Sequence, residues 1–160
     1  MNDYRREDTS GDGTVDFFHW KYAIERIVGC LLMLLTLPLV LTLGALVKLT
    51  SRGPVFCRQT RIGLDGSVFE IMKFRTMRSN SEAGSKAIWS CKIDTRFTRV
   101  GRVLRKLHFD DLPQLWNVVL GEMSLVGPRP ERPEICESLA EHIDGYHGRV
   151  TVKPGVTGLA

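Results

Sequence analysis

The stretch LHFDDLPQLWNVVLGEMSLVGPRPE, residues 107–131, concentrates the chemistry of this 160-residue chain. Two adjacent carboxylates, Asp110 and Asp111, stand just before a Leu-Pro pair, and proline is favoured in the first turn of a helix because its missing N–H would be unpaired there. Apolar residues then recur at the spacing of one helix face, and Gly121 is a natural left-handed stop. We therefore predict a helix over residues 112–120.

The two aspartates allow two interpretations. One of them could serve only as an N-cap, a position at which Asp is strongly preferred. Two adjacent acids exceed what capping needs, and the partial positive charge of a helix N-terminus should keep both ionised near neutral pH. After the helix, residues 123–126 predict a short strand, and residues 127–130 predict an extended, rigid turn. That turn presents Arg129, whose guanidinium suits a phosphate.

The motifs in residues 110–131 resemble the signature of the bacterial sugar transferases, the small monotopic phosphoglycosyl transferases that act on polyprenol phosphate. The resemblance covers about residues 20 to 160 and is an ordered series of unusual motifs, which is more specific than any one of them. Besides residues 110–131, the matching words are residues 53–56, 58–59, 61–63, 73–77, 96–101 and 153–158.

The charge is distributed unevenly along the chain. Residues 1–20 hold five acids and two bases, whereas the other 140 residues hold 20 bases and 13 acids, within a total of +4. A basic body suits nucleic acid, an anionic membrane surface or a polyphosphate substrate. The apolar segment described next favours the membrane, so we expect no nucleic-acid partner. The four cysteines show no C-x-x-C pair or metal-ligand spacing, which indicates reduced thiols in a cytosol-facing protein.

Ile27 to Val47 forms a run of 21 residues without a charged side chain. Such a helix can cross about 30 Å of hydrocarbon, and aromatic residues at 17–22 are typical of a membrane–water interface. Pro38, near the middle, predicts a kink. Basic residues flank both ends and define no polarity, so sequence physics favours a kinked spanning helix. The resemblance implies instead a re-entrant helix that enters and leaves the cytoplasmic face, with its membrane break at Pro38.

The fold class that we predict is α+β, with a re-entrant membrane helix hairpin joined to a small cytosolic catalytic domain. Residues 1–16 should be a mobile acidic tail, residues 17–50 the interfacial and re-entrant helix, and residues 51–160 the catalytic domain. Within that domain we expect a β-hairpin, with strands at 55–62 and 67–74. A basic amphipathic helix at 96–109 either lies on anionic lipid or packs on the core. Because family members continue past the closing Thr-Gly pair, we expect residues beyond Ala160 to help close the site.

The resemblance implies a reaction at the cytoplasmic face of the bacterial inner membrane. A sugar 1-phosphate passes from a nucleotide sugar, expected to carry UDP, to polyprenol (undecaprenyl) phosphate through a covalent aspartyl intermediate, which primes polysaccharide or glycoconjugate synthesis. Membrane lipid is a further partner, and the resemblance allows a homodimer. An alternative is a catalytically impaired, membrane-anchored scaffold or fragment of such an enzyme.

The resemblance also assigns roles to particular residues. Asp110 is the nucleophile, and the second acid binds Mg²⁺; that acid is usually Glu, whereas Asp111 is one methylene shorter. The substrate phosphates are then bound by cations and one neutral donor, namely Lys73, Arg75, Gln114 and Arg129.

Overall fold

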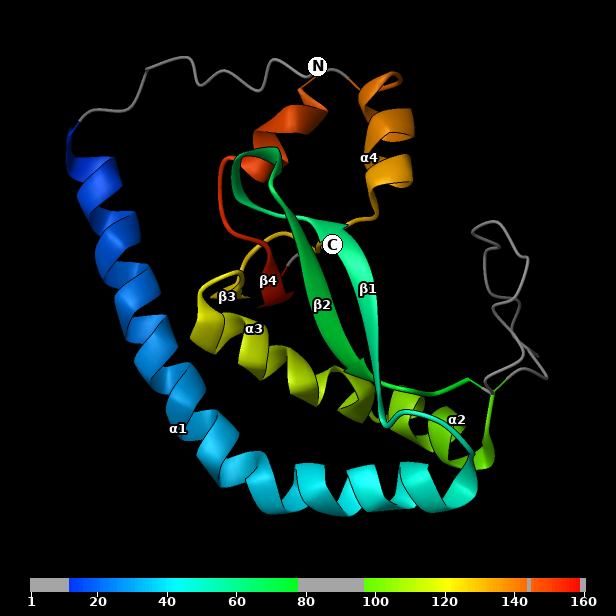
Figure 1. Ribbon diagram of the computed structural model, residues 1–160. Helices are drawn as coiled ribbons and strands as arrows, with labels where there is room; N and C mark the ends of the chain where they lie inside the picture. The colour runs from blue at the N-terminus through cyan, green and yellow to red at the C-terminus, as the bar shows by residue number, and fades with distance from the viewer. Residues whose placement is uncertain (1–11, 78–96, 144, 159–160) are drawn as a thin grey trace. The chain divides into compact units, whose positions relative to one another are not determined.

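The structure is a computed structural model that describes residues 12–77, 97–143 and 145–158. It contains both helices and sheets, which confirms the α+β prediction (Figure 1). In chain order the elements are α1 (Asp12–Thr50), β1 (Phe56–Ile62), η1 (Leu64–Gly66), β2 (Val68–Phe74), α2 (Arg99–Lys106), η2 (Phe109–Gln114), α3 (Leu115–Leu120), β3 (Ser124–Val126), α4 (Pro133–Ala140), η3 (Tyr146–Val150) and β4 (Gly155–Thr157), where η marks a 3₁₀ helix.

The chain forms two compact units. The first unit comprises the chain up to Leu34 together with Gln59–Ile71 and Gln114–Ala160. The second unit comprises Leu35–Arg58 and Met72–Pro113. Helix α1 and the β1–β2 hairpin therefore contribute residues to both units.

Helix α1 begins at Asp12, earlier than the predicted segment 17–50, and ends at Thr50 as predicted. The first eleven residues of the expected acidic tail lie outside the described residues, and Asp12 to Asp16 are helical. The structure has one helix that passes through Pro38, and the re-entrant helix hairpin stays a prediction. The hydroxyl of Thr42 donates a 2.8 Å hydrogen bond to the Pro38 carbonyl, one helical turn back along α1.

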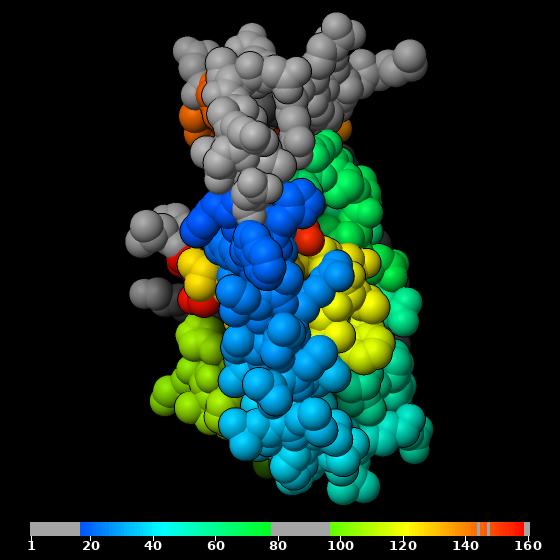
Figure 2. Space-filling model, turned by 90° about the vertical axis from the view of Figure 1, so that its left-hand side faces the viewer, coloured from blue at the N-terminus to red at the C-terminus, as the bar shows by residue number. Residues whose placement is uncertain are grey.

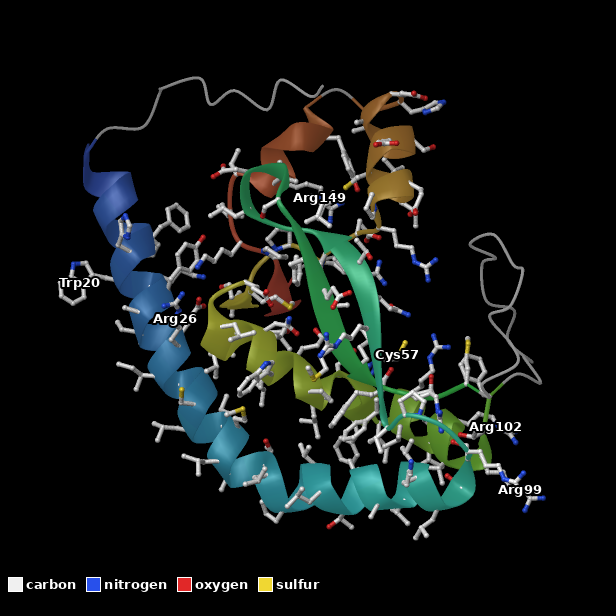
Figure 3. The ribbon with its side chains drawn as sticks, in the orientation of Figure 1. Trp20, Arg26, Cys57, Arg99, Arg102 and Arg149 are labelled. Atoms are coloured by element: carbon white, nitrogen blue, oxygen red, sulfur yellow. The ribbon has the colours of Figure 1, made fainter. Side chains whose placement is uncertain are left out.

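Most of the apolar surface of α1 is not covered by the rest of the described chain. Residues Phe17–Thr50 are long and apolar enough to cross a membrane, and only 11% of their most apolar window is buried. Trp20 points away from the other elements (Figure 3), and the outer surface of α1 faces the viewer uncovered in Figure 2. Because each Å² of apolar surface in water costs about 25 cal/mol, this exposure indicates membrane association.

The first unit has its own core, to which β2, α3 and the residue before β3 contribute. Four residues, Phe69, Ile71, Val118 and Met123, form this core. Strands β3 and β4 pair in parallel, with Ser124 opposite Gly155. The N-terminal part of α1 reaches the same core at Gly29, where a Cβ would lie 3.0 Å from Val118. A larger residue at position 29 would therefore require the Val118 side chain to shift.

The second unit is built around Val47 of α1, Phe74 of β2 and Leu104 of α2. Helix α2 is shorter than the predicted 96–109 and begins after Thr98, whose hydroxyl caps it by accepting from the Gly101 N–H at 2.8 Å. Leu104 is buried, so α2 packs on the core, one of the two arrangements that we predicted. Its basic face turns outward, as Arg99 and Arg102 show in Figure 3.

The predicted helix over residues 112–120 is wrong in its start. A 3₁₀ helix, η2, begins at Phe109 and leads into α3 at Leu115. The cause is His108, which adopts a left-handed conformation (φ 56°) and turns the chain sharply after α2. The predicted stop is confirmed, because Gly121 caps α3 with φ 83°. The hairpin strands agree with the prediction to within one residue at each start.

We predict that Gly101→Ala destabilises the fold although alanine is the better helix former by about 1 kcal/mol. A Cβ at Gly101 would lie 2.1 Å from the backbone oxygen of Thr76, and backbone cannot move aside cheaply. Overpacking of this kind typically costs about 1–3 kcal/mol. Thermal unfolding of the detergent-solubilised protein measures the loss, with Gly148→Ala, which meets open space, as the control. Equal melting temperatures for the two variants would contradict this account of α2 packing.

Candidate active site

The two aspartates lie in the first turn of η2 rather than in front of α3. The N–H of Asp111 donates to the carbonyl of His108 at 3.4 Å. The left-handed turn at His108 therefore orients the backbone that carries the two acids. Both side chains are half-buried. Neither aspartate is therefore the N-cap of α3, one of the two interpretations above, because Gln114 occupies that position.

Lys73, at the end of β2, forms an ion pair with this acid pair. Its ammonium lies 2.8 Å from Oδ1 of Asp111, and the two side chains are 19% and 29% exposed. Residues 38 positions apart in the sequence thus meet inside the second unit. The ion pair joins the strand end, which we predicted to carry substrate-binding cations, to the acids that we predicted to be catalytic.

The pKa of Asp110 is raised above its ordinary value. Burial of the carboxyl is the largest cause, and the negative charge of Asp111 is the second. Lys73 and Arg105 act in the opposite direction but do not outweigh these effects. The helix N-terminus that we expected to stabilise the carboxylate does not dominate, because η2 is a short 3₁₀ segment and burial of the acid prevails.

The donor set at Asp110 and Asp111 fits a magnesium ion. Within the residues that the structure describes, no group of three or more His, Cys, Asp or Glu side chains gathers as a metal cage. Magnesium does not need one, because it is usually held by one or two carboxylates together with substrate phosphates and water. Two adjacent carboxylates, one of them raising the pKa of the other, provide hard oxygen donors and an excess of negative charge. Asp111 would be the protein ligand.

Two of the predicted substrate-binding residues are buried. Arg75 donates from Nη2 to the carbonyl and hydroxyl oxygens of Ser51, at 2.9 and 2.6 Å. The guanidinium is thereby engaged with the chain that follows α1, which favours a structural role. Gln114 belongs to the first unit and is only 3% exposed, at the junction of η2 and α3.

Arg129 is exposed, on the turn that follows β3. Two backbone hydrogen bonds to the β4 region hold this turn: the Gly127 N–H donates to Thr157 at 3.0 Å, and the Gly155 N–H donates to Pro128 at 2.9 Å. A Cβ at Gly127 would lie 2.4 Å from the Lys153 carbonyl, so the backbones meet without room for a side chain. The turn is therefore rigid, and it presents Arg129 as predicted.

Further arginines that sequence reasoning did not assign surround Arg129 in the first unit. A small pocket is lined by Arg129, Glu131 and Arg149 with apolar walls that include Ile62. Arg149 donates to the Arg129 carbonyl at 2.9 Å and to the Tyr146 hydroxyl at 2.5 Å, and Figure 3 shows it beside the hairpin turn.

Arg61 adds to the positive charge near this pocket. Its pKa is lowered, first by burial and then by the charge of Arg132, with a smaller contribution from Arg129. One sequence feature pointed to Arg61: it belongs to the motif at residues 61–63, which resembles the family signature and to which we assigned no role. The gathering itself arises from contacts across long sequence separations, which no local pattern reveals.

The second unit holds an acid pair that is ion-paired to a lysine, the first unit holds an exposed arginine on a Gly-Pro-Arg-Pro turn, and the long apolar helix is the mark of a membrane-associated protein. Residues 17–160 match the family described as "Bacterial sugar transferase", and the chain belongs to this family. The confirmed resemblance thus extends over nearly all described residues.

Curated relatives agree with this assignment. The chain is 46% identical over 136 residues, 85% of its length, to the UDP-glucose:undecaprenyl-phosphate glucose-1-phosphate transferase of Klebsiella pneumoniae. It is 44% identical over 140 residues, 88% of its length, to the enzyme of the same name from Caulobacter vibrioides. It is 46% identical over 123 residues, 77% of its length, to the UDP-N-acetylgalactosamine-undecaprenyl-phosphate N-acetylgalactosaminephosphotransferase of Aeromonas hydrophila. The chain spans 29%, 52% and 29% of the length of these relatives, respectively.

We predict that Asp110→Asn raises the melting temperature at neutral pH. A carboxyl whose pKa is raised in the folded state favours folding while it is protonated, and this contribution is lost as the pH rises through the folded-state pKa. The variant should therefore gain most at pH 7, and its advantage should shrink as the pH falls toward the ordinary carboxyl range of about 4. Thermal unfolding between these values, in metal-free buffer with EDTA, measures the difference.

Asp111→Asn serves as the comparison, because it removes the charge that raises the pKa of Asp110 but also the partner of Lys73, so any gain should be smaller. A gain for Asp111→Asn equal to that of Asp110→Asn would show that burial of Asp110 is not the cause.

Proposed function

We propose that this protein transfers a sugar 1-phosphate from a nucleotide sugar to undecaprenyl phosphate and releases a nucleoside monophosphate. The observation that carries the proposal is the half-buried acid pair, with Lys73 at 2.8 Å from Asp111, in a chain of this family. The names of the relatives support UDP-sugars and undecaprenyl phosphate as the two substrates. They differ in the sugar, glucose or N-acetylgalactosamine, so both belong in any donor panel.

The first chemical step is an attack by a carboxylate oxygen of Asp110 on the phosphorus that bears the sugar. The new bond joins this oxygen to the phosphorus, and the bond from the phosphorus to the bridging oxygen of the diphosphate breaks. Nucleoside monophosphate leaves with that electron pair, and an aspartyl sugar-phosphate remains. The pKa of Asp110 is raised by burial and by Asp111, so its carboxylate is less stabilised and correspondingly more nucleophilic.

The second step returns Asp110 to its starting state. A phosphate oxygen of the lipid attacks the phosphorus of the acyl phosphate, a diphosphate bond forms, and the carboxylate leaves. The two steps balance without a net proton, because UDP-sugar and undecaprenyl phosphate become UMP and the lipid diphosphate sugar.

Cationic residues within each of the two units offset negative charge. Lys73 holds Asp111 in place and offsets part of its charge, and Arg105 acts in the same direction on Asp110. Magnesium, bound through Asp111, would screen the charge of the donor's phosphates. In the first unit, Arg129 and its neighbours Arg61 and Arg149 offer guanidiniums for phosphate oxygens. Arg75 and Gln114 are buried, so they would support the site indirectly and would not contact the substrate.

The membrane location follows from α1 and the lipid substrate. We propose that both ends of Ile27 to Val47 lie on the cytoplasmic face of the inner membrane, where nucleotide sugars are found, so that the catalytic residues meet both substrates. Pro38 inside α1 supports this arrangement, because proline removes one helical hydrogen bond and its ring disfavours a straight helix.

We predict that Asp110 becomes covalently modified when the donor is added without lipid acceptor. Intact-protein mass after incubation with UDP-glucose or UDP-N-acetylgalactosamine should show a sugar-phosphate adduct with release of UMP. Asp110→Asn should lose both, because an amide cannot form the acyl phosphate in the same way. Asp111→Asn should weaken the Mg²⁺ dependence, and Asp111→Glu should preserve or improve turnover.

Two outcomes would overturn this assignment. An adduct that persists in Asp110→Asn, or UMP release that strictly requires the lipid, would favour direct transfer between the substrates. Absence of UMP release with every donor, in a protein that still binds UDP, would instead support the alternative of a membrane-anchored scaffold.

We predict that Pro38→Ala shifts α1 toward a straight, membrane-spanning helix, since removal of an interior proline favours straightness by about 3 kcal/mol. Single cysteines placed at Asp12 and Ser79 in a cysteine-free background report the topology through labelling by a membrane-impermeant thiol reagent. In the unmodified chain both sites should react from the cytoplasmic side. Opposite sides for the unmodified chain would contradict the re-entrant arrangement.

A further inference from the structure

A polar cluster inside the first unit joins α1 to β3, and the proposed reaction leaves it without a role. The ammonium of Lys21 donates to the Ser124 hydroxyl at 2.7 Å and to the Val126 carbonyl at 3.1 Å. It also pairs with Oε1 of Glu25 at 2.9 Å, one helical turn along α1. The other oxygen of Glu25 accepts from the Ser124 hydroxyl at 2.7 Å. We refer to Lys21, Glu25 and Ser124 as the α1–β3 clamp.

The clamp is more than a surface ion pair. The side chains of Lys21 and Glu25 are 25% and 13% exposed, and Ser124 is fully buried. Hydrogen bonds that involve a charged group in such surroundings are shorter and stronger than neutral ones. Loss of one member weakens the hydrogen bonding of the other two in partly desolvated surroundings, so we treat the three side chains as one unit.

The clamp ends next to the turn that carries Arg129. Val126, whose carbonyl Lys21 binds, is the last residue of β3 and directly precedes Gly127. On the other side, the β4 region holds the same turn through the hydrogen bonds from Gly127 to Thr157 and from Gly155 to Pro128. The turn is therefore held between two supports, β4 on one side and Lys21 of α1 on the other.

We propose that Lys21 is a positioning residue for the donor substrate: through the Val126 carbonyl it fixes the turn that presents Arg129 to the donor's phosphates. Lys21 itself does not contact the substrate. The effect on kinetics rests on the proposed function. The effect on the turn rests only on the hydrogen bonds of the clamp. It gives the N-terminal, interfacial part of α1 a part in donor recognition besides anchoring.

Steady-state kinetics of the full chain in nanodiscs test the proposal, with the donor and the undecaprenyl phosphate varied separately. Lys21→Met should raise the KM for the donor about tenfold, since hydrogen bonds from charged donors are the stronger class, and should leave the KM for the lipid unchanged. Lys21→Arg, which keeps a cationic donor, should retain most of the donor affinity. The matched control is Lys48→Met, because Lys48 lies on the same helix and also donates to a backbone carbonyl, that of Gly53 at 3.2 Å.

A double-mutant cycle separates positioning from a general loss of structure. If Lys21 acts through Arg129, Lys21→Met should have no further effect on the donor KM in an Arg129→Met background. Effects that multiply, or an equal rise in the KM for the lipid, would overturn the proposal.

Hydrogen exchange provides a readout that does not depend on turnover. In Lys21→Met, and in Ser124→Ala should the first variant fold poorly, the Gly127 and Gly155 amides should exchange faster than in the parent chain, whereas the Thr98-capped Gly101 amide should not change. Unchanged exchange at Gly127 would overturn the proposal whatever the kinetics show. If the parent chain transfers no sugar phosphate from any donor, the proposed function fails, and exchange alone decides whether the clamp holds the turn.

Discussion

The structure depends on helix α1, whose apolar surface is largely uncovered by the rest of the described chain. Leu35 and Leu49 are 75% and 84% exposed, which water would penalise heavily and lipid would not. Yet the same helix is essential to both cores, since Val47 is a central residue of one and Gly29 packs against Val118 of the other. The helix therefore acts as a membrane element on its outer face and as a core element on its inner face.

The acid pair shows how the site works against stability. Asp110 is half-buried next to a second carboxylate, and both conditions disfavour its charged form. The chain limits this cost with Lys73 and Arg105 without removing it. A carboxylate fully stabilised by partners would be a poor nucleophile, so incomplete compensation at Asp110 is consistent with the chemistry that we propose.

The sequence predicted what depends on neighbouring residues. The hairpin strands and the stop at Gly121 were correct because turn glycines and strand patterns act locally. The predicted helix start at residue 112 was wrong because it depends on the left-handed turn at His108. Such a turn is usually made by glycine, and no glycine stands at this position. The substrate roles of Arg75 and Gln114 stay predictions, although burial of both side chains, with Arg75 bonded to Ser51, could not be anticipated from composition. The pairing of Lys73 with Asp111 likewise required the fold, because a strand end and a turn far along the chain had to meet.

Glycines at three positions meet backbone to backbone where the turn after β3 lies against β4. A Cβ at Gly155 or Gly158 would lie 2.1 Å from a backbone atom of Gly127, and one at Gly127 would lie 2.4 Å from the Lys153 carbonyl. A side chain at any of the three positions would force backbone to shift, which is costly. The pocket beside the turn can therefore change in shape through its apolar lining, such as Ile62 and Val150, more easily than through the glycines of the turn.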